Sequence, residues 1–348
     1  MHARGLDYVH ETTGPWATVR TDSYMTDRWQ ELGLLRTFRE DYRKRRVYGQ
    51  QGEIAVWASP LPEEEVLDSY IGRQAVKFVE KYEENKPVCL FVGFGGPHEP
   101  WDAPGRYATM YDPAQVPPAI PANKLQAWNP PSARAHEELW GRPELSEDAI
   151  RRLRANYYGK ISLIDHWFGE ILSAFERKGW LEEALVVFWS DHGEMAGDHG
   201  RLHKSVFYEA SVRVPLILRW PGHIEAGGIR DTLVASIDVF PTLLEAVGAE
   251  PSQRCFGRLL WPALDRPEHR HRDAVFSEIA PHGHKNMMVR TERYKYAIDE
   301  TGSGYVLYDI MEDPTEATNL IGREDVRPVE REMRERILTF LAGTQYHL

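Results

Sequence analysis

The stretch that most constrains this chain is an apolar run, ALVVFWS (residues 184–190), that stops directly before Asp191-His192-Gly193. A short apolar run without polar alternation is typical of a strand buried in a parallel sheet. In open α/β folds, ligands bind at the carboxyl ends of such strands. We therefore expect Asp191 and His192 to lie at the functional edge of an α/β sheet.

Other segments predict a mixed fold of strands and helices. Further strands are expected at PVCLFVGF (87–94), VRVPLILRW (212–220) and DTLVAS (231–236), and helices at residues 26–46, 62–82, 146–178 and 238–248. The third helix should start at the cap Ser146 and end at Gly179. Its apolar positions, spaced by three or four, include Ile150, Leu153, Ile161 and Ile164.

The pattern changes after about residue 270. Short segments rich in β-branched and aromatic residues, separated by turn residues, predict an antiparallel sheet. These segments are AVFSEI, NMMVRT, YKYAID and YVLYDI, and a last helix is expected over residues 324–342. We expect an α/β domain over residues 1–268 and a smaller α+β subdomain, a four-stranded sheet with a helix, over 269–348.

Composition and charge make some classes of binding partner improbable. The 348 residues carry a formal net charge of −11, which argues against nucleic acid or an anionic membrane surface. No apolar run is long enough to cross a bilayer, and the first residues have no signal-peptide core, so the sequence leaves the cellular location open. Cys89 and Cys255 form no zinc spacing and no disulfide framework, so both are interpreted as structural thiols.

Four side chains are candidates for chemistry. Asp191 and His192 offer an oxygen and a nitrogen suited to a divalent cation, although an Asp cap followed by an exposed His would look the same. Lys204 could hold an oxyanion beside that cation, or be a solvated surface lysine. His98, after the strand expected at 87–94, could serve a leaving group or be a loop histidine with local hydrogen bonds. Asp198-His199-Gly200 is either a second ligand pair or, the interpretation we prefer, a turn.

Longer motifs carry a family resemblance. SDHGEMAGDHGRLHKSVFYEASVRVPLILRWPG, FVGFGGPHEPW, YYGKISLIDHWFGEIL, DVFPTLLEAVG and the tail RTERYKYAIDE…YVLYDIMEDPTEATNL resemble the formylglycine-dependent (type I) sulfatases of the alkaline phosphatase superfamily. The resemblance covers about residues 85–345. It implies an alkaline-phosphatase-like α/β/α sandwich, with Asp191 and His192 as ligands of a divalent cation, usually calcium. Lys204 and His98 match residues that contact the sulfate and the leaving group of a sulfate-ester substrate.

One departure from the family matters. The Cys-x-Pro-x-Arg or Ser-x-Pro-x-Arg motif that becomes formylglycine is absent, as is the first pair of Asp ligands. The chain therefore resembles a sulfatase truncated at its N-terminus, and we expect it to be inactive unless another chain supplies that segment. Alternatives are a phosphate or phosphonate ester hydrolase of the same superfamily, and a non-catalytic scaffold protein.

Overall fold

The computed structural model describes residues 5–50, 53–84, 86–122, 145–250, 255–280 and 283–344. These divide into two compact units, which we describe separately. The first unit comprises the described residues of Met1–Ala119 and Trp140–Glu182, and the second those of Ile120–Leu139 and Glu183–Leu348. The unit limits differ from the predicted domains because the long helix groups with the N-terminal segments, whereas the strands that follow it group with the C-terminal sheet.

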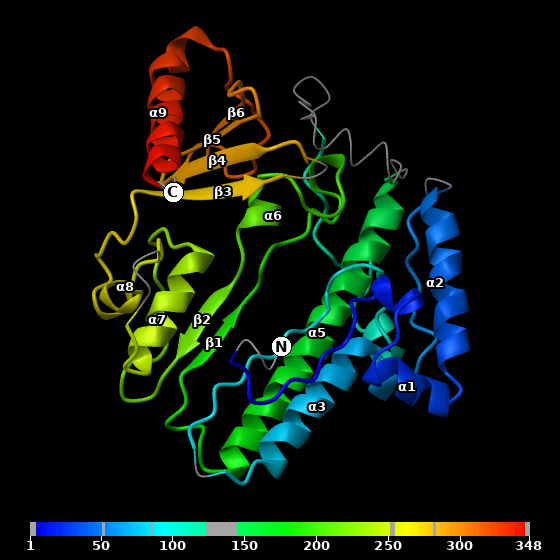
Figure 1. Ribbon diagram of the computed structural model, residues 1–348. Coiled ribbons are helices and arrows are strands. Elements are labelled where there is room, and N and C mark those ends of the chain that lie inside the picture. Colours follow the sequence, from blue (N-terminus) through cyan, green and yellow to red (C-terminus); the bar gives the residue numbers. More distant parts are fainter. Residues whose placement is uncertain are drawn as a thin grey trace. The chain divides into compact units, whose positions relative to one another are not determined.

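The first unit is built mainly from helices. They are α1 (Tyr24–Glu31), α2 (Leu35–Gln50), α3 (Leu67–Lys81) and α5 (Glu147–Arg177), with short 3-10 turns η2 (Ala17–Val19), η3 (Glu63–Glu65) and η4 (Gly105–Ala108). α3 packs along α5 (Figure 1). The single helix expected over residues 26–46 is wrong. Gly33 takes a positive φ of 72°, and the Leu34 N–H bonds the Trp29 carbonyl, which closes α1 before α2 begins.

The predicted limits of α5 are confirmed. The Ser146 hydroxyl accepts a hydrogen bond from the Ala149 N–H, and Gly179 ends the helix with a φ of 73°. The prediction of which α5 residues are buried is partly wrong, since Ile161 is 43% exposed whereas Lys160 and Leu163 are buried. The buried face therefore includes a lysine, for which the surrounding loops supply partners.

The second unit contains all the named strands among the described residues. β1 (Val186–Trp189) pairs antiparallel with β2 (Leu216–Arg219), with Val186 opposite Arg219. Residues 87–94 and 231–236, which we expected as strands, are not strands in the structure. Phe91 is 76% exposed and Cys89 is exposed, so the apolar character of 87–94 does not correspond to burial here. The parallel pairing expected for β1 is likewise wrong.

The C-terminal sheet is confirmed as antiparallel. Its strands are β3 (Ala274–Ile279), β4 (Asn286–Thr291), β5 (Tyr294–Ile298) and β6 (Gly304–Asp309), paired in that order. Helix α9 (Arg327–Thr344) packs on β4, β5 and β6. The second unit also holds α6 (Glu209–Val212), α7 (Val239–Ala246) and α8 (Trp261–Asp265), and the 3-10 turns η5 (Asp198–Gly200), η6 (Ser236–Asp238) and η8 (Glu324–Val326). Among the described residues, no helix is both long and apolar enough to cross a membrane.

Candidate functional site

The segment between β1 and α6, residues 190–208, holds three of the four predicted site residues, and we call it the Asp191 loop. Asp191 follows β1 by two positions, and 86% of its side chain is exposed. Its Oδ2 lies 3.7 Å from Nε2 of His192. Two ligand atoms at that separation can reach a single cation at the bond lengths typical of protein sites. The structure therefore brings Asp191 and His192 together as a possible pair of ligands.

A hydrogen bond orients the imidazole of His192. Its Nδ1 lies 2.8 Å from the carbonyl oxygen of Gly193, which can only accept, so Nδ1 carries the proton. In the neutral ring, Nε2 then presents a lone pair on the side of Asp191. Metal-binding histidines are commonly fixed in this way, with the second nitrogen donating to a carbonyl. The donor set and its tautomer thus fit a divalent cation.

The Asp191 loop concentrates unusual backbone conformations. Five described residues other than glycine have a positive φ, and four of them lie in this loop: Ala196 at 43°, His199 at 55°, His203 at 65° and Ser205 at 74°. Such conformations cost about 1–3 kcal/mol each and cluster at binding and catalytic sites, where the surrounding structure enforces them. Lys204 lies between two of these residues, so its backbone direction is closely determined.

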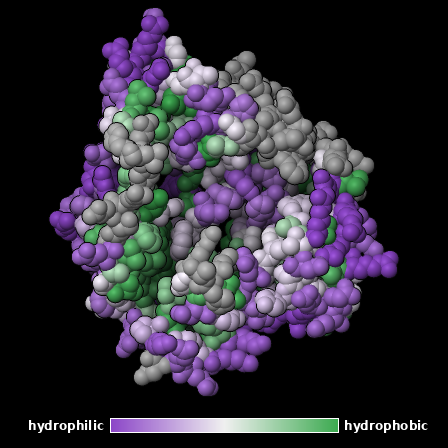
Figure 2. All heavy atoms as spheres, viewed as in Figure 1, coloured by the Kyte–Doolittle hydropathy of each residue, from purple (hydrophilic) through white to green (hydrophobic). Residues whose placement is uncertain are grey.

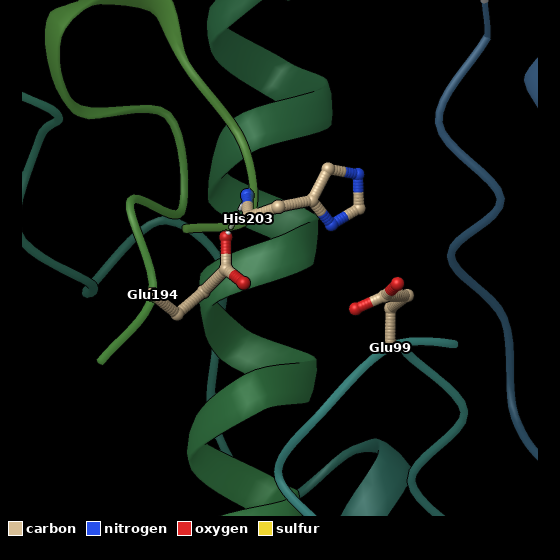
Figure 3. A group of neighbouring side chains, drawn as sticks. All are labelled: Glu99, Glu194 and His203. Carbon is tan, nitrogen blue, oxygen red and sulfur yellow. Dashed lines mark hydrogen bonds between the residues drawn. The ribbon is translucent and has the colours of Figure 1, made fainter. Parts of the chain in front are cut away.

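Internal hydrogen bonds enforce that shape. The Glu194 carboxylate accepts from the backbone N–H of Ala196. It also accepts from the backbone N–H of His203 (Figure 3). The N–H of the fully buried Met195 donates to the His203 carbonyl at 2.9 Å. Gly193 donates to the Ser211 carbonyl at 2.7 Å, and a side chain at Gly193 would collide with the Ala210 carbonyl. Glycine is therefore required where the loop turns away from β1.

The second Asp-His-Gly triplet is a turn, as preferred from the sequence. Residues Asp198–Gly200 form the 3-10 turn η5, and Asp198 Oδ1 accepts from the Ile120 N–H at 2.7 Å. The His199 ring stacks on Tyr208 with ring centroids 3.9 Å apart. Burial against this ring lowers the pKa of His199, with a smaller opposing effect of Asp198. These contacts make the triplet a structural element of the loop.

Buried ion pairs fix the far end of the loop. Glu209, the first residue of α6, lies 2.7 Å from the Lys295 ammonium, which also bonds Glu316 at 2.6 Å. Lys295 is fully buried on β5. Burial alone would raise the pKa of Glu209, but the charges and hydrogen bonds of Lys295 and Arg290 lower it overall. The sequence motifs did not point to Glu194, Glu209 or Lys295, although a lysine within an apolar strand is a recognisable pattern.

His98, the fourth predicted residue, belongs to the first unit. Its Nδ1 lies 2.8 Å from the carbonyl oxygen of Glu99 and 2.9 Å from the Glu99 carboxylate. The carbonyl can only accept, so Nδ1 carries a proton and Nε2 is the atom that can exchange one. The local hydrogen bond expected of a loop histidine is present, and it also fixes the ring for proton transfer at Nε2.

Comparison with known proteins decides the family. The sequence profile described as "Sulfatase" matches residues 7–249, well over half of the chain. The chain belongs to the sulfatase family. A second profile, "N-sulphoglucosamine sulphohydrolase, C-terminal", matches residues 197–342. The family resemblance read from the Asp191 loop and the C-terminal strands is confirmed.

Characterised relatives of this sulfatase-family chain include an arylsulfatase of Clostridium perfringens, 28% identical over 283 residues, which are 80% of this chain and 58% of the relative. A choline-sulfatase of Rhizobium meliloti is 32% identical over 248 residues, 68% of this chain and 47% of the relative. The chain thus spans about half to three fifths of the length of these proteins.

Solved structures confirm the mixed α/β fold. A phosphonate monoester hydrolase of Agrobacterium radiobacter aligns with a TM-score of 0.74 and 28% identity, covering 84% of this chain and 64% of that one. A putative sulfatase of Bacteroides thetaiotaomicron aligns with a TM-score of 0.67 at 20% identity, covering 86% and 74%, which supports the fold alone.

Proposed function

We propose that this chain supplies the cation-binding and oxyanion-binding part of an enzyme that hydrolyses sulfate esters. The observation that carries the proposal is the Asp191 loop. It presents an oriented Asp-His pair and a lysine on a strained, internally bonded backbone, in a chain of the sulfatase family.

Asp191 and His192 would hold a divalent cation, most simply calcium, with water molecules and further groups completing its shell. Such a cation polarises the oxygens of a bound ester and stabilises negative charge on them. Lys204 would bind another oxygen of the same anion through its ammonium. The hydrogen bond from His192 Nδ1 to the Gly193 carbonyl would keep Nε2 directed at the cation.

His98 would serve the leaving alcohol. With Nδ1 committed to the Glu99 carbonyl, Nε2 is the atom that would give a proton to the departing oxygen. The carboxylate of Glu99 forms an ion pair with the ring whenever the imidazole is protonated. This arrangement suits a general acid, because the protonated ring has a nearby negative partner.

The residues present do not provide a formylglycine nucleophile. Cys89 begins Cys-Leu-Phe-Val and Cys255 begins Cys-Phe-Gly-Arg, and neither fits Cys-x-Pro-x-Arg. We therefore propose that the 348 residues alone do not turn over sulfate esters and that the nucleophile is supplied by a further polypeptide segment. We also propose that residues 269–348 form the smaller C-terminal subdomain of the assembled enzyme.

A second candidate function is hydrolysis of phosphonate or phosphate esters. Its support is the 28% identity to the Agrobacterium phosphonate monoester hydrolase. The same cation and lysine would suit either tetrahedral anion, so the absent nucleophile segment would discriminate between them. A non-catalytic scaffold protein is the third possibility, from a different class.

The test extends the expressed gene into the DNA that precedes the Met1 codon and compares the product with residues 1–348. Each protein is assayed with an aryl sulfate and with an aryl phosphonate in the presence of calcium. The Lys204→Ala variant is assayed in the same way, with Lys86→Ala, at an exposed lysine, as its control. We expect an in-frame Cys-x-Pro-x-Arg, aryl sulfate turnover by the longer protein alone, and loss of that turnover with Lys204→Ala only. Faster phosphonate turnover would favour the second candidate. An upstream sequence without a nucleophile motif would favour the scaffold.

A further inference from the structure

The loop that carries His98, residues 95–103, is held at three points by buried side chains of three helices, and we call it the His98 loop. The helices are α2, α3 and α5, and α3 packs along α5 within the first unit (Figure 1). The proposed function assigns roles to His98 but none to the side chains that hold its loop.

Lys160 of α5 holds the middle of the loop. Its ammonium donates to the carbonyl oxygens of His98 and Pro100, both at 2.8 Å, and to Asp102 Oδ1 at 3.0 Å. An ammonium has three N–H donors, so these bonds use all of them. Lys160 is only 6% exposed, and a buried lysine is costly unless its charge is paired and its donors are satisfied.

Asp68 of α3 holds the start of the loop. Its Oδ1 accepts from the N–H groups of Gly95 and Gly96, at 2.8 and 2.9 Å. Any side chain at Gly96 would collide with the Asp68 carboxylate, so glycine is required for this approach. Burial raises the pKa of Asp68, while the nearby charge of Lys160 acts in the opposite direction. Asp68 and Lys160 are thus two buried charged groups that bind different parts of the same loop.

The end of the loop is fixed from α5 and α2. The Ala103 N–H donates to Asn156 Oδ1 at 3.0 Å, one helical turn before Lys160. The Tyr42 hydroxyl donates to Asp102 Oδ2 at 3.1 Å, so both oxygens of Asp102 are used. Residues 100–103 of this loop are buried, where polar groups cannot bond to water, so these side chains supply the partners that fix its backbone.

We propose that Lys160 and Asp68 are positioning residues, which place the His98 imidazole by fixing the backbone on both sides of it. Lys160 binds the carbonyl of His98 itself, and Asp68 binds the amides two and three residues before it. The ring is in turn oriented by the Glu99 carbonyl, so the tautomer of His98 depends on a backbone that Lys160 holds. The inference rests on the proposed function for its catalytic meaning, but the positioning can be measured without turnover.

The experiment uses residues 1–348 labelled with ¹⁵N at histidine, with the His98 resonances assigned by their loss in His98→Gln. Wild type is compared with Lys160→Met, with Lys160→Arg and with the matched control Lys295→Met. Lys295 is also a fully buried, doubly paired lysine, but it lies in the second unit. Circular dichroism establishes that each variant is folded, and amide exchange is followed over residues 95–103.

We expect the neutral His98 ring of wild type to carry its proton on Nδ1, and Lys160→Met to give a mixture of both tautomers. Amide exchange at His98, Glu99 and Trp101 should rise at least tenfold in Lys160→Met. Lys160→Arg should restore part of the wild-type behaviour, and Lys295→Met should leave His98 unchanged. An unchanged tautomer and exchange rate in Lys160→Met would overturn the proposal, as would an equal effect of Lys295→Met.

A second variant keeps the proposal testable if Lys160→Met does not fold. Asp68→Ala removes the acceptor of two loop amides, and we expect at least tenfold faster exchange at Gly95 and Gly96. Unchanged exchange at both glycines would contradict the proposal. A separate experiment tests the proposed function of His98. If a His98→Ala variant of the active, longer protein hydrolysed esters normally, the proposed function would be wrong. The loop measurements on Lys160 and Asp68 would not be affected by that result.

Discussion

The C-terminal sheet and the β1–β2 pair lie in the same unit but are covered to very different degrees. In β4, β5 and β6 nearly every residue is buried, and both faces of the sheet pack against other groups. Met287, Val289 and Leu307 face Met333 and Ile337 of α9, whereas the alternate residues pack around Phe207. β1 and β2, although as apolar in sequence, contain no buried residue.

The difference teaches that apolar character predicts a strand but not what covers it. Ile217 of β2 is 60% exposed, and Phe240 of α7 is 55% exposed. Figure 2 shows hydrophobic surface on the viewed face in the region of β1, β2 and α7. Exposed apolar surface of this kind marks an interaction site or an aggregation liability. We propose that the segment carrying the nucleophile also covers the β1–β2 pair.

The largest expected effect is at the buried charges of the C-terminal sheet. Lys295→Met leaves Glu316 buried without a cation and Glu209 with Arg290 alone, at 3.2 Å, and breaking a buried ion pair typically costs about 3–5 kcal/mol. The matched control is Lys285→Met, since Lys285 pairs with Glu278 at 3.1 Å but is 53% exposed, and exposed pairs contribute about 0–1 kcal/mol. Urea unfolding measures both losses. Similar losses for the two variants would show that burial of the Lys295 network is not what stabilises this sheet.

A somewhat smaller effect distinguishes two isoleucines. Ile337 of α9 is fully buried against the sheet, so Ile337→Ala should cost about 2–5 kcal/mol in unfolding free energy. Ile217→Ala on β2 makes the same chemical change at an exposed position and should cost at most about 1 kcal/mol. If Ile217→Ala were as destabilising as Ile337→Ala, β2 would have to be covered in solution.

Low pH should destabilise the second unit through the half-buried His199 and the buried His271. Burial lowers the pKa of His199 and of His271, so the unfolded chain takes up protons at a higher pH than the folded one. Stability should therefore be constant above about pH 6.5, the pKa of free histidine, and fall as the pH drops below it. Urea midpoints at pH 7.5 and 5.5 measure this change. His199→Gln should reduce the pH dependence, and an unaltered dependence would exclude His199 as a source.

The smallest effect on stability is expected at Asp191. Because 86% of its side chain is exposed, Asp191→Ala should change the unfolding free energy by no more than about 0.5 kcal/mol. Calorimetric titration with calcium should show weak binding to the wild-type chain, because two side chains provide few of the six to eight ligands that calcium takes. Asp191→Ala should abolish that heat, whereas Asp148→Ala, at an exposed position of α5, should retain it. Submicromolar affinity would mean that more ligands are present than Asp191 and His192.

Local patterns predicted a good part of the fold. Ser146 and Gly179 set the ends of α5 because capping is a short-range effect. Segments rich in β-branched and aromatic residues, separated by turn residues, predicted the four C-terminal strands. The break at Gly33 was missed because a left-handed residue ends a helix without interrupting its apolar spacing. The prediction of a strand at residues 87–94 was wrong. A strand forms only against a partner strand, and the residues of the segment itself do not specify that partner.

The residues of the candidate site, like the elements of the fold, were predicted from the sequence only in part. Asp191, His192 and Lys204 were predicted because they follow an apolar strand, and the structure places all three on one loop. Lys160 and Asp68 were missed because each interrupts an apolar face whose other members predict burial. A charged residue at such a position indicates a buried partner, but the partner lies far away in the sequence, as Asp102 does from Lys160.

The most direct test of the account compares amide exchange in β1 and β2 with that in β4, β5 and β6, together with the mass of the chain in solution by size-exclusion chromatography and light scattering. A two-stranded pair with exposed apolar surface should open more easily than a covered sheet and offer a template for another chain. We predict faster exchange over Val186–Trp189 than over β4, and self-association of the chain. A monodisperse monomer with β1 amides as protected as those of β4 would contradict the account.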